Sequence, residues 1–149
     1  LVRGHARLDG EKRVVVTDDD GIDTILIARH AVAVCTGSAA LLPDIPGLRE
    51  VEPWTSRDAT AVQHPPASLT VLGGGVVGAE MATADAGFGT EVTLLARSGL
   101  LGGTEPFAGE MVEEALRALG VDVRTNVDVV RARAADDGLA VLELSDGSE

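Results

Sequence analysis

Three glycines in the middle of the chain, Gly73, Gly75 and Gly78, have the G-x-G-x-x-G spacing of a loop that binds a dinucleotide. An apolar run at residues 69–72 predicts a buried strand before them, and apolar residues at helical spacing follow up to residue 88. The first glycine allows a tight turn, the second lets the backbone approach a pyrophosphate, and the third lets the helix pack close to the strand.

The free N–H groups and the positive end of this helix would face the phosphates, so Val76 and Val77 join the three glycines as candidate cofactor-binding residues. The alternative is a glycine turn between two packed elements with no ligand, because 18 of the 149 residues are glycine. The following segment favours binding. Residues 87–97 end the helix with glycine and begin a second apolar strand at 92–95, which completes a βαβ unit.

The end of this second predicted strand indicates which nicotinamide cofactor to expect. A carboxylate there would hold the ribose 2′-hydroxyl, but the sequence has Ala96, followed by Arg97 and Ser98. No carboxylate at this position repels a 2′-phosphate, and a guanidinium can pair with one. The sequence therefore favours NADP, with NAD as the alternative, and makes Arg97 and Ser98 candidate contacts. The competing interpretation of Arg97 is a solvated loop charge.

Composition excludes several classes of function. The formal net charge of −12 argues against nucleic acid and anionic membranes as partners. A single cysteine, Cys35, excludes an internal disulfide, and the scattered His5, His30 and His64 provide no zinc ligand set. With no signal peptide and no apolar run of transmembrane length, we expect a cytoplasmic protein without a metal site. The first and last residues resemble neither a natural start nor a natural end, so we expect a piece of a longer protein.

Three regions are expected along the chain. Residues 1–40 alternate short strands with tight turns, at 1–8, 13–17, 24–28 and 31–34. Residues 41–67 form a connector without regular structure, because five of the six prolines lie between residues 39 and 66. Residues 68–149 hold the βαβ unit, a second helix, a third strand at 121–123 and a hairpin of 127–134 with 139–144.

The second helix should be capped by Thr104 and should begin with Pro106 in its first turn. Its predicted core face consists of Met111, Val112, Ala115, Leu116 and Leu119. The stretch from residue 14 to residue 21 also resembles residues 129–138, since each is an apolar strand followed by an acidic turn ending in glycine. This weak internal echo suggests two related nucleotide-binding domains, the first without its beginning and the second without its end.

Four segments together resemble the pyridine nucleotide–disulfide oxidoreductases, the FAD enzymes that include glutathione reductase, dihydrolipoamide dehydrogenase and mercuric reductase. Residues 4–6 are similar to the segment that contacts the FAD adenine, and residues 34–38 with 45–47 to the element that ends the FAD-binding region. Residues 54–58 are similar to the segment crossing to the second domain, and 73–80 to the NAD(P)H loop. The strand end at 92–98 looks most like mercuric reductases and other NADPH-using members.

The resemblance implies further site residues. His5 and Ala6 would contact FAD, and Thr36 and Gly37 would touch it through the backbone. Glu80 resembles the glutamate that pairs with a lysine beside the flavin, or it is an acid in the first helical turn stabilised by the dipole.

Some residues depart from the family pattern. Val76 stands where an aromatic is common, and Gly103 stands where NADP-using members often have a second arginine. Cys35 replaces a usual alanine and is interpreted as a small buried hydrophobe. The FAD-domain glycine loop, the Cys-x4-Cys redox pair and the C-terminal His-Glu pair are absent from the sequence, so it predicts no catalytic residue.

The predicted fold class is α/β, with a Rossmann-like NAD(P)-binding domain at 68–149 that lacks its C-terminal strand. The C-terminal antiparallel part of an FAD-binding domain, at 1–40, precedes it. The expected function is part of a flavin-dependent oxidoreductase that passes hydride from NADPH to FAD and on to a disulfide or metal ion. The complete protein should be a homodimer, and this chain alone should be inactive. The alternatives are a ferredoxin- or quinone-type reductase without a redox disulfide, and a non-catalytic NAD(P)-sensing module.

Overall fold

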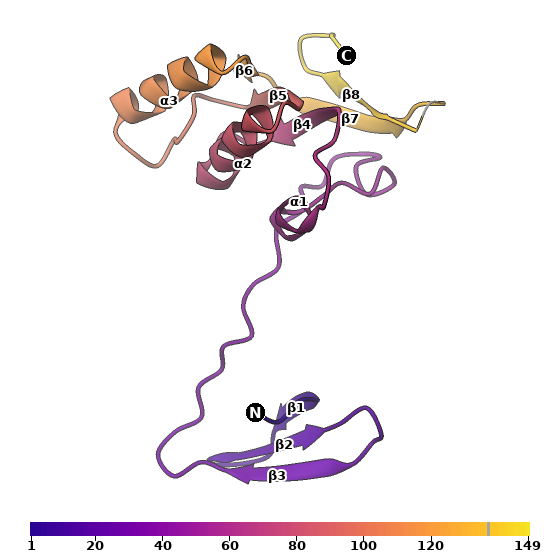
Figure 1. The fold of residues 1–149 in the computed structure, drawn as a ribbon, viewed down its shortest axis with the longest axis vertical. Helices are drawn as coiled ribbons and strands as arrows, with labels where there is room; N and C mark the ends of the chain where they lie inside the picture. The colour runs from indigo at the N-terminus through magenta and orange to yellow at the C-terminus, as the bar shows by residue number, and fades with distance from the viewer. Residues whose placement is uncertain (137) are drawn as a thin grey trace. The chain divides into compact units, whose positions relative to one another are not determined.

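The computed structural model of the chain describes residues 1–136 and 138–149 (Figure 1). It divides into two compact units, unit 1 at Leu1–Ala39 and unit 2 at Ala40–Glu149. No helix in the described part of the chain is both long enough and apolar enough to cross a membrane. The predicted α/β class is confirmed, since unit 1 holds antiparallel strands and unit 2 combines helices with parallel and antiparallel strands.

Unit 1 is a three-stranded antiparallel sheet with the strand order β1-β2-β3. The strands are β1 (His5–Leu8), β2 (Arg13–Thr17) and β3 (Asp23–Ile27), so the first strand begins at residue 5 and not at residue 1 as predicted. Val15 and Val16 on the central strand are buried, whereas every residue of β1 and β3 is exposed. Few apolar side chains are therefore removed from water within this unit.

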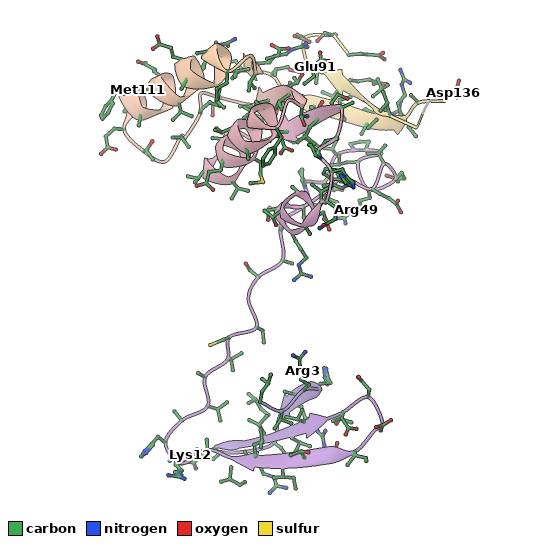
Figure 2. All side chains as sticks on the ribbon, viewed as in Figure 1. Arg3, Lys12, Arg49, Glu91, Met111 and Asp136 are labelled. Carbon is green, nitrogen blue, oxygen red and sulfur yellow. The ribbon has the colours of Figure 1, made fainter. Side chains whose placement is uncertain are left out.

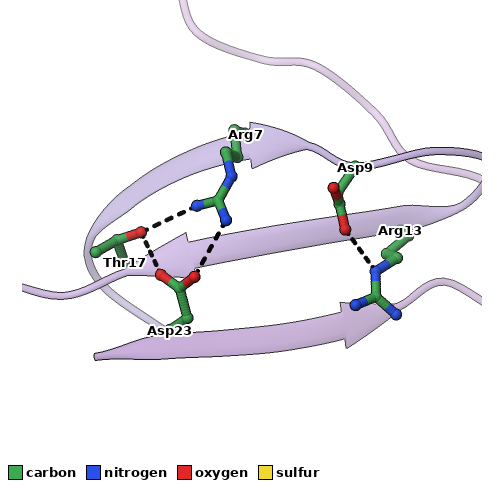
Figure 3. A network of polar contacts seen from close by, with 5 residues as sticks. All are labelled: Arg7, Asp9, Arg13, Thr17 and Asp23. Atoms are coloured by element: carbon green, nitrogen blue, oxygen red, sulfur yellow. Dashed lines mark hydrogen bonds and ion pairs between the residues drawn. The ribbon is translucent and has the colours of Figure 1, made fainter. Parts of the chain in front are cut away.

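A polar network crosses the three strands of unit 1 (Figure 3). The Arg7 guanidinium donates to the Asp23 carboxylate at 3.1 Å and to the Thr17 hydroxyl at 3.2 Å. The Thr17 hydroxyl in turn donates to Asp23 at 2.6 Å, and Arg13 pairs with Asp9 at 2.7 Å. Donation from Thr17, followed by that from Arg7, lowers the pKa of Asp23 below its ordinary value. Because these groups are exposed, the network contributes little to the stability of the fold.

The strand predicted at residues 31–34 is wrong. The segment has no regular secondary structure and pairs with no strand in the described part of the chain. Cys35, interpreted from sequence as a buried hydrophobe, is exposed. A strand is stable only where a neighbouring strand satisfies its N–H and C=O groups, and apolar composition alone does not supply that neighbour.

Unit 2 alternates strands and helices before it ends in a hairpin. Its elements in chain order are α1 (Ser56–Ala61), β4 (Ser68–Leu72), α2 (Val76–Gly87), β5 (Glu91–Ala96), α3 (Pro106–Ala118), β6 (Asp122–Thr125), β7 (Val129–Ala134) and β8 (Ala140–Leu144). Strands β4, β5 and β6 form a parallel sheet in that order, and β7 pairs with β8 antiparallel. The predicted parallel strands, the two helix starts near residues 76 and 106 and the terminal hairpin are confirmed. The acidic turn predicted between the two strands of this hairpin, at residues 136–138, includes residue 137, which lies outside the described residues.

The parallel sheet of unit 2 has a different cover on each face. Leu94 belongs to a core cluster that also contains Ala82 of α2 and Leu116 of α3. Its neighbour Leu95 belongs to a second cluster, with Leu144 of β8. Successive residues of a strand point to opposite faces. The helices α2 and α3 therefore cover one face and the hairpin covers the other, as the ribbon in Figure 1 shows.

The buried faces of both helices differ from the sequence patterns. On α2 the buried residues are Ala79, Ala82 and Asp85, while Phe88, which fits the apolar spacing, is 72% exposed. On α3 only the middle of the predicted face is covered. Leu116 is buried and Val112 is half-buried, but Ala115 and Leu119 are exposed. Met111, which is labelled on α3 in Figure 2, is exposed as well. Small residues on α2 allow close helix–sheet packing, and this outweighs the burial of larger side chains.

Two local predictions for unit 2 need correction. The connector contains a short helix, α1, because no proline lies between Pro53 and Pro65 and because Thr55 and Asp58 support its first turn. The Asp58 carboxylate accepts the Thr55 backbone N–H at 2.8 Å and its hydroxyl at 2.7 Å. At the start of α3 the capping residue is Glu105, with Pro106 following it, and the hydroxyl of Thr104 donates instead to the Leu101 carbonyl at 2.8 Å.

Candidate dinucleotide-binding site

The glycine loop joins β4 to α2 at the carboxyl edge of the parallel sheet. The Gly73 N–H donates to the Leu95 carbonyl at 2.9 Å, which fixes the start of the loop to the neighbouring strand β5. Gly75 is the N-cap of α2, and its carbonyl accepts the Ala79 N–H at 3.0 Å. The first N–H groups of the helix have no acceptor within the helix. They are available to an anion placed over the loop.

The three glycines of the motif occupy different steric environments. Gly73 has a φ of +113°, a conformation that side chains rarely adopt. A β-carbon on Gly78 would collide with the carbonyl oxygen of Gly73. A β-carbon on Gly75 would meet no heavy atom within 4 Å. The first glycine thus makes the turn, the third brings the helix onto the loop, and the second leaves open space above the backbone.

Gly74, which lies between the first two glycines of the motif, must also be a glycine for a steric reason. A β-carbon at this position would lie 2.9 Å from the Ala96 Cβ and 2.7 Å from the Leu100 Cδ2. Its carbonyl accepts the Leu101 N–H at 2.8 Å. The loop is therefore held against the segment that follows β5, and the two segments together form one edge of a cavity.

A cavity of about 650 Å³ opens at this edge of unit 2. It is lined by the ends of the parallel strands, the glycine loop, part of the connector and the segment before β7: Leu41, Pro43, Asp44, Ile45, Leu72, Gly73, Gly74, Gly75, Leu95, Ala96, Arg97, Ser98, Gly99, Gly102, Val127, Asp128 and Val129. In open parallel sheets, ligands bind outside the carboxyl ends of the strands. The position and size of the cavity suit part of a dinucleotide.

Charged side chains gather at one part of the cavity wall. The Arg97 Nε lies 3.7 Å from the Asp128 Oδ1, and the two side chains are 85% and 56% exposed. Asp44 contributes a second carboxylate to the lining. Among the described lining residues Arg97 is the only cation, so the wall carries one positive and two negative formal charges. Ser98 is exposed beside Arg97, and its hydroxyl donates to the Gly99 carbonyl at 3.5 Å.

The structure brings some of the predicted site residues together. Gly73, Gly75, Arg97 and Ser98 line the 650 Å³ cavity. A neighbouring, more apolar cavity of about 570 Å³ is lined by Gly73, Gly75 and Gly78 and by two exposed side chains of α2, Val76 and Val77.

The other predicted site residues lie elsewhere. Glu80 is the fifth residue of α2, and it is exposed. The interpretation of Glu80 as a first-turn acid is therefore wrong, since the first turn of α2 contains no acidic residue. His5 and Ala6 lie on β1 of unit 1, and Thr36 and Gly37 follow in its segment without regular structure. All four are exposed.

Sequence reasoning missed Asp128 and the connector residues at the cavity. Asp128 lies three positions after the end of β6. Because the carboxyl ends of neighbouring parallel strands meet at one edge of the sheet, the sequence could have placed Asp128 near the end of β5. Asp44 carried no comparable signal, because only the path of the connector brings it to the wall. The described residues contain no cluster of three or more His, Cys, Asp or Glu side chains able to hold a metal ion.

Comparisons with known proteins show which sequences this chain is similar to. A family model described as pyridine nucleotide-disulphide oxidoreductase matches residues 3–149. Mercuric reductases from Streptomyces lividans and Shigella flexneri are 37% and 34% identical to the chain, over 100% and 99% of its length and over 31% and 26% of their own. A dihydrolipoyl dehydrogenase from Geobacillus stearothermophilus is 32% identical over 99% of the chain and 31% of its own length. The chain thus spans about a quarter to a third of these relatives.

Solved structures show the same fold. The HOCl-induced flavoprotein disulfide reductase RclA from Escherichia coli aligns with a TM-score of 0.76 at 23% identity, over 95% of this chain and 33% of that one. An engineered water-forming NADPH oxidase bound to NADPH aligns with a TM-score of 0.70 at 22% identity, over 93% of this chain and 32% of that one. At these identities the likeness concerns the fold alone.

Proposed function

The chain belongs to the pyridine nucleotide-disulphide oxidoreductase family, and on that premise we propose that unit 2 binds a nicotinamide dinucleotide, NADPH in preference to NADH. The pyrophosphate lies over Gly75 at the start of α2. The adenosine ribose lies in the 650 Å³ cavity, where Arg97 pairs with a 2′-phosphate. Family membership implies both FAD and a nicotinamide cofactor in the complete protein.

The observation that carries this proposal is the open space at Gly75. Gly73 and Gly78 are glycines because the fold itself requires them, but nothing in the described structure fills the space above Gly75. The N-terminus of α2 points its free N–H groups there, and no acidic side chain of the first turn opposes an anion. These features support a phosphate-binding role for the loop.

In the complete protein we propose that the reductant bound by unit 2 supplies the flavin, which passes electrons to a disulfide or a metal ion. The role of this chain's residues is to bind and orient the dinucleotide. His5, Ala6, Thr36 and Gly37 are exposed and form no enclosed FAD site by themselves. We therefore expect the purified chain to be colourless and unable to oxidise NADPH with disulfide or metal acceptors.

A titration of the 149-residue chain tests the proposal. The backbone amide NMR signals are followed while NADPH or NADH is added to millimolar concentration. We expect shifts at residues 73–78 and at Arg97, and a lower dissociation constant for NADPH. Signals of unit 1 serve as an internal control. Shifts scattered over the whole chain, or none at these residues, would overturn the proposed function.

A further inference from the structure

We propose that Asp128 is a specificity-determining residue at this site, which weakens the preference for NADPH by competing with the 2′-phosphate for Arg97. The inference rests on the proposed function, because it concerns the selectivity of the same cavity. It predicts that the chain prefers NADPH to NADH only weakly, although Arg97 by itself would favour NADPH strongly.

The backbone holds the two side chains beside one another. The Val127 N–H donates to the Ala96 carbonyl at 3.2 Å, so the next residue of each segment, Asp128 and Arg97, lies at the same place on the sheet edge. Asp128 is also fixed from the hairpin side. Its N–H donates to the Ser145 hydroxyl at 3.0 Å, and its carbonyl accepts the Ser145 N–H at 2.8 Å. These three bonds leave the carboxylate free to face the guanidinium.

The pair contributes little to the stability of the fold. The Nε and Oδ1 atoms are 3.7 Å apart, and both side chains are largely exposed, a geometry in which ion pairs have little effect on folding. The pair affects cofactor binding instead, because both residues line the 650 Å³ cavity.

The charges at this wall oppose a second phosphate. A 2′-phosphate must displace the Asp128 carboxylate from Arg97 and then remain close to it, and Asp44 adds a further negative charge to the lining. A cofactor without this phosphate meets no such repulsion, and a carboxylate can accept a hydrogen bond from the ribose 2′-hydroxyl. Asp128, from the segment after β6, can thereby supply the acidic group that the end of β5 lacks.

Asp128→Asn tests the inference with little change of shape. The backbone bonds to Ser145 do not involve the carboxylate, so the variant should keep the fold. We expect the ratio of the NADH to the NADPH dissociation constant to rise about fivefold, as for the loss of one unit charge about 4 Å from another near water. The dissociation constants come from the amide titration with NADPH and NADH, and Glu114→Gln on the exposed surface of α3 controls for the change in net charge.

A double-mutant cycle tests whether Asp128 acts through Arg97. In an Arg97→Gln background, Asp128→Asn should raise the ratio less than it does in the unmodified chain, because the competition for the guanidinium is gone and only the direct effects of the carboxylate on the ribose substituent remain. An equal rise in both backgrounds would show that Asp128 does not act through Arg97. An unchanged ratio in Asp128→Asn, or an equal rise in Glu114→Gln, would overturn the inference while leaving the proposed function intact. If the unmodified chain binds neither cofactor, the proposed function itself fails.

Discussion

The α-carbon of Gly78 lies so close to the carbonyl oxygen of Gly73 that no β-carbon fits between them. The first turn of α2 therefore rests directly on the loop that precedes it. This contact places the N-terminus of the helix at the cavity. It also shows that the two glycines have different roles, because the fold requires Gly78, whereas only an approaching ligand would require Gly75.

Substitutions in the loop should separate folding from binding. Gly78→Ala should destabilise unit 2 by about 2 kcal/mol or more, because overpacking against a backbone carbonyl costs about 3 kcal/mol or more and helix propensity returns about 1 kcal/mol. Gly75→Ala should leave stability within about 1 kcal/mol but weaken NADPH binding. Urea unfolding followed by the fluorescence of Trp54, the only tryptophan, reports on unit 2.

Gly87→Ala is the matched control for Gly75→Ala, because a β-carbon at either glycine meets no heavy atom within 4 Å. It should leave both stability and NADPH binding close to those of the unmodified chain. Equal binding by the Gly75→Ala and Gly87→Ala variants would contradict a phosphate site over the loop.

Reversing the charge of Arg97 should change cofactor choice. Arg97→Glu should weaken NADPH binding about ten- to hundredfold, the loss of a charge-assisted pair of about 1.5–3 kcal/mol, and leave NADH binding nearly unchanged. Dissociation constants from parallel titrations with the two cofactors measure the effect. An unchanged NADPH/NADH ratio would identify Arg97 as a solvated loop charge.

Removal of a core side chain from α3 should destabilise unit 2. Leu116 is 1% exposed and packs in the cluster that joins both helices to the sheet. Leu116→Ala should lower the free energy of unfolding by about 2–5 kcal/mol through lost burial and the cavity left behind. Leu119→Ala is the control, because Leu119 is 53% exposed. Similar urea midpoints for both variants would show that α3 does not pack as described.

Acid should loosen helix α1. The pKa of Asp58 lies below its ordinary value of 3.8, because its carboxylate accepts the Thr55 backbone N–H first and the Thr55 hydroxyl second. Because the pKa of Asp58 is lower in the folded state than in the unfolded state, its charged carboxylate stabilises α1. This stabilisation is complete above the unfolded-state pKa and is lost as the pH falls through the folded-state pKa. The Asp58 carboxyl signal in an NMR titration should therefore move below pH 4, together with the α1 amides.

The variant Thr55→Val checks the cause of this shift. It removes the hydroxyl donor but keeps the backbone donor, so the pKa of Asp58 should return part of the way to its ordinary value. No change in the titration of Asp58 would mean that the Thr55 hydroxyl does not stabilise the charged carboxylate.

Local sequence signals were sufficient to predict an element where residues close together in the sequence determine it. The strand at 13–17, the helix starts at Val76 and Pro106 and the hairpin of β7 and β8 each follow from residue type and spacing within a short window. The predicted strand at 31–34 was wrong because a strand depends on a partner. The predicted core face of α3 was wrong in part because packing partners decide which side of a helix is covered.

The sequence by itself determined the glycine loop, the parallel βαβ order and the basic residue after β5, because these depend on backbone freedom and short-range periodicity. Only the tertiary structure brought Asp128 to 3.7 Å from Arg97 and Asp44 into the same wall. Residues 31 positions apart meet there because neighbouring parallel strands end at one edge, and the Val127–Ala96 hydrogen bond fixes their alignment. No local pattern in the sequence contains that contact, since it arises from the pairing of β5 with β6.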